Sequence, residues 1–338
     1  MIGLAEEAVS EPSVEFTSIT ALDVDSRGRI YVGDFFQPVV TVLGPDGRRL
    51  RTFGRRGSGP GEFRAIRGIQ LLPGDSVLVY DPGLARVSVY APEGAQPAYV
   101  TNLAAKRSGP APFHLWRARA NDGYLALFRP AFMFRDGVAQ PAREDVVRVL
   151  ELDGAPRGDR LLAFPSRSFL VASSSVMPNP FGREGLVRPD SKDRLHFVWS
   201  DSLRVRTFAL DGEAAGGFAH PHDPPPVTAR DVRREIEGLD GEGRATFGAT
   251  LRDSVPERWP AVRDLLVDES DRVWIALGGA PGDPTEWVAF TTAGAYLGSV
   301  RVPQGVAVRL VRGGRMYAEW TDDRGVPRVV VLRLDRPV

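Results

Sequence analysis

The sequence predicts an all-β protein, a six-bladed β-propeller built from four-stranded antiparallel blades. Two observations predict this fold class: a strand–turn–strand pattern recurs six times along the 338 residues, and the last copy lacks its fourth strand. The chain is also rich in Gly (36) and Pro (28), which suits many short strands joined by tight turns. A four-stranded meander cannot bury both faces alone, whereas six arranged radially can, because each sheet packs on the next.

Each copy contains a third strand rich in β-branched residues, and the first five of these strands lead into a turn that ends in glycine. These turns read Asp46-Gly47, Glu93-Gly94, Asp153-Gly154, Asp211-Gly212 and Ala293-Gly294. Glycine favours hairpin turns because it adopts positive φ without steric cost. The turns therefore predict a third and a fourth strand in each of the first five blades.

The first two strands of each blade precede this hairpin and are separated by a short polar turn. The clearest strand pairs are 21–24 with 30–32, 69–72 with 77–80, 264–267 with 273–275, and 308–311 with 316–318. The sixth copy stops after its third strand, so its outer strand has to come from elsewhere in the chain. We expect residues 3–9 to pair with 329–334 and close the ring, which also removes an exposed sheet edge.

We expect one propeller domain over residues 1–338. The blades are expected at about 16–54, 64–103, 113–165, 185–220, 260–303 and 305–335, the last completed by 3–9, with a helical insertion at 222–258. Within this insertion, Thr228 and Asp231 have the spacing of a capping box, and Val232, Ile236 and Leu239 form an apolar stripe. This pattern predicts a helix near 228–239.

The repeat resembles that of the NHL family. The segment 22–34 (LDVDSRGRIYVGD) and the connector 53–63 (FGRRGSGPGEF) look like parts of an NHL-type repeat, and Asp81 before Arg86 repeats the family's spacing. The resemblance covers residues 16–103 and 259–338 and is poor across 104–258. It implies similarity to bacterial six-bladed propeller proteins, which include binding scaffolds, lyases and lactonase-like enzymes, so the fold alone assigns no function.

Composition narrows the kinds of partner. Acidic and basic residues balance at 43 each, without the basic surplus typical of nucleic-acid-binding proteins, so we expect no nucleic-acid partner. No run of about 18 apolar residues exists, so we expect no membrane span. No cysteine is present, which excludes disulfides and thiolate ligands. The cellular location stays open, because the resemblance implies export to the periplasm whereas residues 1–7 show no signal peptide.

The long connections are expected to share one face of the ring. They occupy 54–66, 104–114, 129–145, 165–186 and 219–260, each in a B–C or D–A connection when the strands of a blade are lettered A to D. Insertions gathered on one face typically mark a binding surface, although drift on a tolerant surface is the alternative. We therefore expect the ligand or partner, an unidentified small molecule, saccharide, peptide or protein, on this insertion-rich face.

Arginine and aromatic side chains are the candidate ligand contacts. Arg67 and Arg263 each stand ten residues before the second strand of their blade, and we expect Arg117 to be placed similarly in the third blade. A partial ring of guanidinium groups at the channel mouth would bind a carboxylate or phosphate, or would bridge neighbouring blades instead. The further candidates near these connections are Arg129, Trp116, Trp259, Phe132 and Phe134.

No catalytic residue is predicted. His220 and His222 are the only close pair of histidines and are the candidates for a metal site. Asp34 and Asp81 end second strands, and we expect them to accept hydrogen bonds from a neighbouring turn. We therefore expect a non-catalytic binding scaffold without a cofactor. The alternative is a metal-dependent propeller enzyme, a lyase or lactonase-like hydrolase, with a divalent cation in the central channel.

Overall fold

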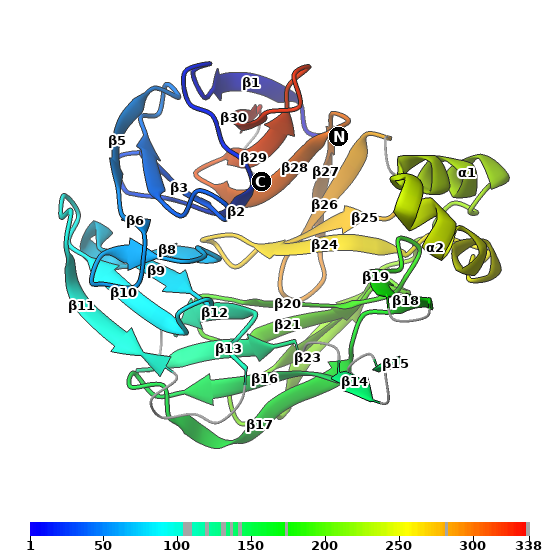
Figure 1. Ribbon diagram of the computed structural model, residues 1–338, viewed down its shortest axis with the longest axis horizontal. Coiled ribbons are helices and arrows are strands. Elements are labelled where there is room, and N and C mark those ends of the chain that lie inside the picture. Colours follow the sequence, from blue (N-terminus) through cyan, green and yellow to red (C-terminus); the bar gives the residue numbers. More distant parts are fainter. Residues whose placement is uncertain are drawn as a thin grey trace.

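The strands form a ring of six antiparallel sheets around a central axis (Figure 1). The computed structural model describes residues 1–103, 110–118, 122–129, 133–135, 138–140, 144–172, 175–280 and 283–335. Within these residues, each of the six sheets is a four-stranded meander, with strand A innermost and strand D outermost. The protein is therefore an all-β six-bladed propeller, as predicted.

The blades follow one another along the chain. Blade 1 contains β2 (Ile19–Val24), β3 (Ile30–Asp34), β4 (Val40–Leu43) and β5 (Arg49–Phe53). Blade 2 contains β8 (Gly68–Leu71), β9 (Val77–Asp81), β10 (Arg86–Tyr90) and β11 (Pro97–Asn102). Blade 3 contains β12 (His114–Arg117), β13 (Tyr124–Phe128), β16 (Glu144–Leu150) and β17 (Pro156–Pro165).

The second half of the ring repeats this arrangement. Blade 4 contains β20 (Gly185–Pro189), β21 (Leu195–Trp199), β22 (Arg204–Phe208) and β23 (Ala214–Ala219). Blade 5 contains β24 (Val262–Val267), β25 (Val273–Leu277), β26 (Thr285–Phe290) and β27 (Tyr296–Val302). Blade 6 contains β28 (Val306–Arg312), β29 (Arg315–Thr321), β30 (Pro327–Leu334) and β1 (Leu4–Val9).

The N-terminal strand closes the ring, as the sequence predicts. β1 pairs antiparallel with β30, so that Leu4 lies opposite Leu334 and the first and last strands share one sheet. The buried guanidinium of Arg328 reinforces this closure. It pairs with Asp322 at 3.0 Å and donates to the carbonyl oxygen of Val14 at 2.5 Å, which ties the N-terminal segment to the last blade.

The hydrophobic core lies between neighbouring blades. Strand B is fully buried in the first two blades, because its side chains pack against the adjacent sheet on either side. One of the largest clusters joins blades 5 and 6 and includes Trp274, Trp287 and Met316, all of which are buried. Radial packing thus buries both faces of each sheet, as a propeller requires.

The turn glycines adopt the conformation that the sequence predicts, with one exception. Gly47, Gly154, Gly212 and Gly294 have φ angles of +81°, +86°, +86° and +89°. Such angles are costly for residues with a Cβ atom, which explains glycine at these turns. Gly94 is absent from the residues with positive φ, so the turn in blade 2 has a different conformation.

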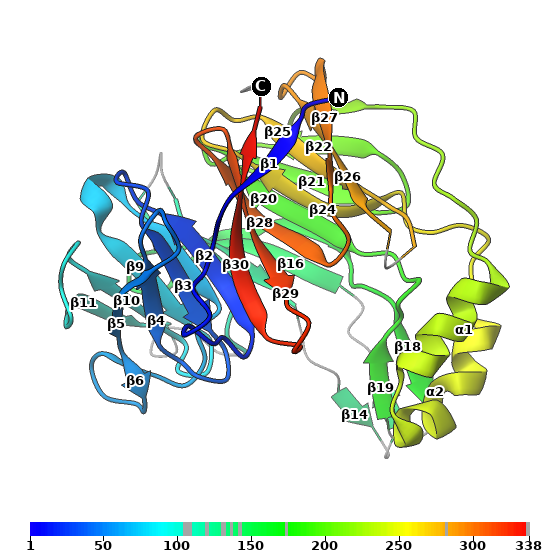
Figure 2. The same cartoon turned by 90° about the horizontal axis from the view of Figure 1, so that it is seen from above.

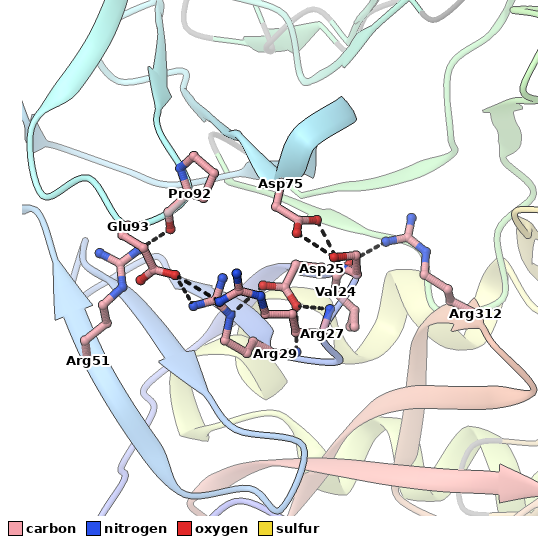
Figure 3. Close-up of polar contacts among 10 residues, drawn as sticks. Val24, Asp25, Arg27, Arg29, Arg51, Asp75, Pro92, Glu93 and Arg312 are labelled. Carbon is pink, nitrogen blue, oxygen red and sulfur yellow. Dashed lines mark hydrogen bonds and ion pairs between the residues drawn. The ribbon is translucent and has the colours of Figure 1, made fainter.

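Polar contacts join the blades on the face that carries the short A–B turns (Figure 3). Arg29 of blade 1 pairs with Glu93 of blade 2 at 2.5 Å. The hydroxyl of Ser26 in blade 1 donates to Asp75 of blade 2 at 2.6 Å. Asp75 belongs to a short 3₁₀ helix, Pro73–Asp75, that forms the A–B turn of blade 2. These contacts fix the relative position of neighbouring blades at this face.

The long connections lie on the opposite face, as predicted. β6 (Arg55–Arg56) and β7 (Glu62–Phe63) stand between blades 1 and 2, and β14 (Met133–Arg135) and β15 (Val138–Gln140) lie within blade 3. β18 (Phe169–Ala172) and β19 (Ser175–Pro178) stand between blades 3 and 4. Figure 2 shows β6, β14, β18, β19 and both helices on the lower side of the ring, away from the chain termini. Part of the predicted 104–114 segment lies outside the described residues.

The predicted helix is present as α1 (Ala229–Gly238), between blades 4 and 5. Thr228 caps it: its hydroxyl accepts from the backbone N–H of Asp231 at 3.3 Å, while the Asp231 carboxylate accepts from the backbone N–H of Thr228 at 2.9 Å. This is the capping box expected from the sequence. Among the described residues, neither helix is long and apolar enough to cross a membrane.

A second helix, α2 (Gly241–Asp253), was not predicted. Its glycines, Gly241, Gly243 and Gly248, lower the helix propensity and obscure the pattern. The helix nevertheless forms because Asp240 caps its start and Phe247 and Leu251 are buried against the neighbouring insertion.

Candidate functional site

The innermost strands of all six blades surround a cavity of about 260 Å³ on the ring axis. Several charged side chains in its wall form ion pairs between blades. Arg188 of blade 4 lies 3.2 Å from Asp264 of blade 5, and Arg312 of blade 6 lies 2.6 Å from Asp23 of blade 1. The charges of these pairs compensate each other within the wall, so the pairs join blades and leave little net charge for a ligand.

Three arginines lie near one another beside the end of the channel on the insertion-rich face: Arg67 is in the wall of the channel cavity, and the charges of Arg129 and Arg167 act on it. Arg67 immediately precedes β8, Arg129 follows β13, and Arg167 precedes β18. The ring of Phe113 lies between two of them, with its centroid 4.5 Å from Cζ of Arg67 and 4.9 Å from Cζ of Arg129. We call these four residues, together with Glu184, the channel-mouth cluster.

The arginines of the channel-mouth cluster differ in their partners. Arg129 is paired, with Nε 2.6 Å from Asp145 and Nη1 3.6 Å from Glu184. In the part of the chain that the structure describes, the side chains of Arg67 and Arg167 form no hydrogen bond or ion pair, and Nε of Arg167 is buried without a partner. Both are partly buried and lie over aromatic rings, and the carboxylates of Glu184 and Asp145 act on Arg167 only through their charge.

Burial also changes the electrostatics of the cluster. Removal from water lowers the pKa of Arg67 below its ordinary value, and the nearby charges of Arg167 and Arg129 lower this pKa further. Burial likewise lowers the pKa of Arg167. Burial raises the pKa of the Glu184 carboxyl, although Arg129 and Arg167 oppose this rise. The guanidinium groups remain charged at neutral pH because arginine titrates so far above it.

A neutral histidine lies beside the cluster in the channel wall. Burial lowers the pKa of His114 to about 3, with additional repulsion from Arg188, Arg67 and Arg129. The imidazole is therefore uncharged at neutral pH and offers one donor and one acceptor nitrogen. Its ring lies against Trp116, with 5.6 Å between the centroids. The site thus combines unpaired guanidinium groups with a neutral hydrogen-bonding group and aromatic surfaces.

The structure separates the arginines that the sequence grouped together. Arg67 lines the channel on the insertion-rich face, as expected. Arg117 does not share its position: it stands at the other end of its strand, opposite Tyr124, because it lies only seven residues before strand B of blade 3, whereas Arg67 lies ten residues before strand B of blade 2. Its side chain donates to the carbonyl oxygen of Gly123 at 2.8 Å and pairs with Asp122 at 3.1 Å, which fixes its own turn.

The remaining candidates have varied surroundings. Trp116 lines the channel cavity. Trp259 is only 2% exposed and packs on Phe181, so its ring belongs to the core beneath the helices and does not face the channel. Phe134 lies in β14, and Phe132 lies outside the described residues. Arg263 lines a separate cavity, described below.

The two candidate metal-binding histidines point to different surroundings. His220 is stacked on Tyr296, with 6.3 Å between the ring centroids, whereas His222 lines the same separate cavity as Arg263. Among the residues that the structure describes, no group of three or more His, Asp or Glu side chains is placed to hold a metal ion.

The recurrent aspartates hold turns, as the sequence predicts. The buried carboxylate of Asp34 accepts hydrogen bonds from the backbone N–H groups of Thr17, Ser18, Phe36 and Gln37 at 2.5–3.1 Å. Asp81 accepts in the same way from the backbone of Arg64, Ala65 and Leu84. These carboxylates connect the end of strand B to the segment that leads into strand A.

Sequence reasoning missed Arg167, Glu184 and Phe113 of the channel-mouth cluster. Each stands in a D–A connection, just before an inner strand or an added hairpin. That position was itself a usable signal, because residues there lie at the channel mouth on the insertion-rich face. The poor match of the repeat across 104–258 hid the positions at which these strands begin.

The ring of six sheets and the channel lined by their innermost strands define a six-bladed β-propeller with a candidate site at one mouth. No protein-family model matches the chain. No curated protein matches its sequence.

Solved structures resemble the fold. The structure of a protein from Bacteroides fragilis, named as exported, has a TM-score of 0.55 at 9% identity, covering 99% of this chain and 95% of that one. A member of the DUF4221 family from Bacteroides vulgatus has a TM-score of 0.54 at 10% identity and covers 99% of both chains. Virginiamycin B lyase from Staphylococcus aureus reaches 0.49 at 10% identity, covering 99% and 100%, and supports no conclusion about this chain. At these identities the likeness shows the fold alone.

Proposed function

We propose that the protein is a non-catalytic binding scaffold that holds an anionic ligand at the channel-mouth cluster. The observation that carries this proposal is the pair of unpaired, partly buried guanidinium groups of Arg67 and Arg167. Withdrawing a cation from water without a partner costs free energy, and an anion that enters the site would offset that cost. Such unpaired, desolvated groups are characteristic of ligand sites.

The chemistry of the cluster favours a carboxylate or a phosphate. A guanidinium group donates two parallel hydrogen bonds to either anion. The ring of Phe113 supports Arg67 and Arg129 from one side, which limits the orientations that these side chains adopt. The neutral imidazole of His114 adds one directional hydrogen bond without adding charge. Arg129 is paired with Asp145, so it would attract the anion mainly through its positive charge and not through hydrogen bonds.

We also propose that the repeat is of the NHL type. Its support is the recurring aspartate that ends strand B and the recurring ion pair within the A–B turns. The pairs are Asp25–Arg29 at 2.6 Å, Asp190–Arg194 at 2.7 Å and Asp268–Arg272 at 2.7 Å. Burial opposes ionisation of Asp190, but hydrogen bonds from His196, Arg194 and Lys192 lower its pKa to about 2. The same turn chemistry thus recurs in three of the blades.

Calorimetric titration tests the proposed anion site. Inorganic phosphate, succinate and galacturonate are titrated into the wild type and into the Arg67→Gln and Arg167→Gln variants. We expect at least one probe to bind the wild type and each substitution to weaken it by about 10-fold or more, because each removes a charge-assisted contact.

Arg117→Gln is the matched control, because it removes the same charge from the opposite end of the channel. It should leave the affinity within about twofold of wild type. The proposal fails if no probe binds the folded protein, or if Arg117→Gln weakens binding as much as Arg67→Gln does.

A further inference from the structure

A second cavity, of about 290 Å³, lies on the insertion-rich edge of blade 5. Its wall includes His222, Arg263, Asp283, Glu286 and Arg301, and we call it the blade-5 cavity. Arg263 holds the same position in its blade as Arg67. Each stands directly before a strand A residue that pairs near the end of strand B, Asp264 with Ala276 and Gly68 with Tyr80. Nevertheless the two side chains line different cavities. The blade-5 cavity is therefore a site distinct from the channel mouth.

Two polar groups in the wall of the blade-5 cavity lack partners. Within the described ranges, the side chain of Arg263 forms no hydrogen bond or ion pair, and Nε2 of His222 is buried without a partner. Burial lowers the pKa of Arg263, although the charges of Asp283 and Glu235 oppose this effect. Burial lowers the pKa of His222 as well. Buried polar groups without partners call for a bound molecule or an ordered solvent.

The same cavity also contains two carboxylates, those of Asp283 and Glu286, without a close ion-pair partner among the described residues. The carboxylate of Glu286 lies 3.9 Å from Arg301, at the limit of an ion pair. Among the described residues, Asp283 forms no ion pair through its side chain, and it is exposed. A simple anion would satisfy Arg263 but would be repelled by these two carboxylates. A molecule that carries both charges would satisfy both sides of the cavity.

We infer that the blade-5 cavity binds a small zwitterion, a free α-amino acid, with its carboxylate on Arg263 and its ammonium group toward Asp283 and Glu286. The cavity volume is at the lower end of the range for small-molecule pockets, which suits a ligand of this size. The guanidinium group binds the carboxylate through two parallel hydrogen bonds. His222 supplies one further hydrogen bond. This inference stands independently of the anion site proposed for the channel mouth.

Titration with L-alanine and with its two halves tests this inference. L-alanine, sodium acetate and methylammonium chloride are titrated separately into the wild type by calorimetry. We expect L-alanine to bind at least 10-fold more tightly than acetate or methylammonium, because only the amino acid meets both charges in one cavity. Equal affinity for acetate and L-alanine would overturn the inference, since it would identify a site for anions alone.

Three variants locate the site. Arg263→Gln and Asp283→Asn should each weaken L-alanine by 10-fold or more, whereas Arg67→Gln should leave it unchanged. Asp283 is exposed, so Asp283→Asn keeps the test valid if Arg263→Gln does not fold. Loss of L-alanine binding in Arg67→Gln, with retention in Asp283→Asn, would place the ligand at the channel mouth and refute the blade-5 site. Absence of L-alanine binding to the folded wild type would refute it as well.

Discussion

His114 shows how one partly buried side chain makes stability depend on pH. Its pKa is about 3 in the folded protein, below the ordinary histidine value of 6.5. Between these two values the unfolded chain binds a proton that the folded protein excludes, so stability is complete above pH 6.5 and falls as the pH decreases toward 3. Burial is the main cause of this exclusion, and the arginines that add to it belong to the candidate anion site or line the channel beneath it. The electrostatic character of the channel therefore contributes to acid sensitivity.

We predict that His114→Gln makes the loss of stability on acidification shallower. Between pH 6.5 and 5 the variant should lose about 2 kcal/mol less free energy of unfolding than the wild type, at about 1.4 kcal/mol per pH unit. Denaturant titrations at pH 7, 6 and 5 measure this difference. His220→Gln, at an exposed histidine, should retain the wild-type slope. Parallel slopes for wild type and His114→Gln would contradict the prediction.

We predict that Asp34→Ala destabilises the protein by about 2–3 kcal/mol, because it leaves several backbone N–H groups without their acceptor. Asp201→Ala is the matched control. Asp201 follows strand B of blade 4 but is exposed, and the hydroxyl of Ser200 accepts the hydrogen bond from Glu184 instead. Its replacement should change the free energy of unfolding by less than about 0.5 kcal/mol. Chemical denaturation measures both, and equal effects would show that the Asp34 contacts add nothing.

The sequence located some site residues and misplaced others for a simple physical reason. Arg67 was found because the repeat in blade 2 is regular, so that counting back from strand B reaches the correct end of strand A. The same reasoning failed for Arg117, which lies only seven residues before strand B of blade 3 and therefore at the opposite end of strand A. The channel-mouth cluster forms where connections far apart in the sequence meet. The spacing of residues along the chain does not predict such contacts.

At the scale of elements, capping decides which insertions the sequence reveals. α1 was predicted because Thr228 and Asp231 form a capping box before an apolar stripe. α2 also has a side-chain cap, at Asp240, but three glycines in its sequence, so its stability comes from burial of Phe247 and Leu251. Tertiary packing of this kind overrides propensity and is invisible in a local pattern.

We predict that Thr228→Ala weakens α1 by about 1 kcal/mol, because the backbone N–H of Asp231 loses its acceptor. Hydrogen exchange of the amides at the start of α1 should accelerate, while amides in the blades should be unaffected. Thr228→Ser keeps the hydroxyl and should exchange like the wild type. An unchanged exchange rate in Thr228→Ala would show that α1 is held by packing alone.

At the scale of the whole molecule, the ring depends on the pairing of β1 with β30. The alternation of strands and turns predicted the number of blades. It also predicted the closure, because the unpaired edge of the last sheet needs a partner strand. The absence of cysteine offers a direct way to test the closure, since any introduced pair of thiols is free of competing partners.

We predict that a disulfide between Ala5→Cys and Arg333→Cys stabilises the protein. The two positions face each other across β1 and β30, and neighbouring antiparallel strands bring Cα atoms within the range that a disulfide spans. The oxidised double variant should unfold several degrees higher than the wild type, with the gain lost on reduction. Ala5→Cys alone should match the wild type. Failure of the bond to form under oxidising conditions would contradict the closure.

Closure through a shared sheet also decides which face of the molecule points outward when the protein is tethered through a terminus. The two ends of the described chain emerge from the same sheet, on the side away from the helices and added hairpins (Figure 2). A tether or fusion partner at either end therefore leaves the far side of the disc pointing outward. Immobilisation through either terminus should give the same orientation, with both candidate cavities open to the surrounding solution.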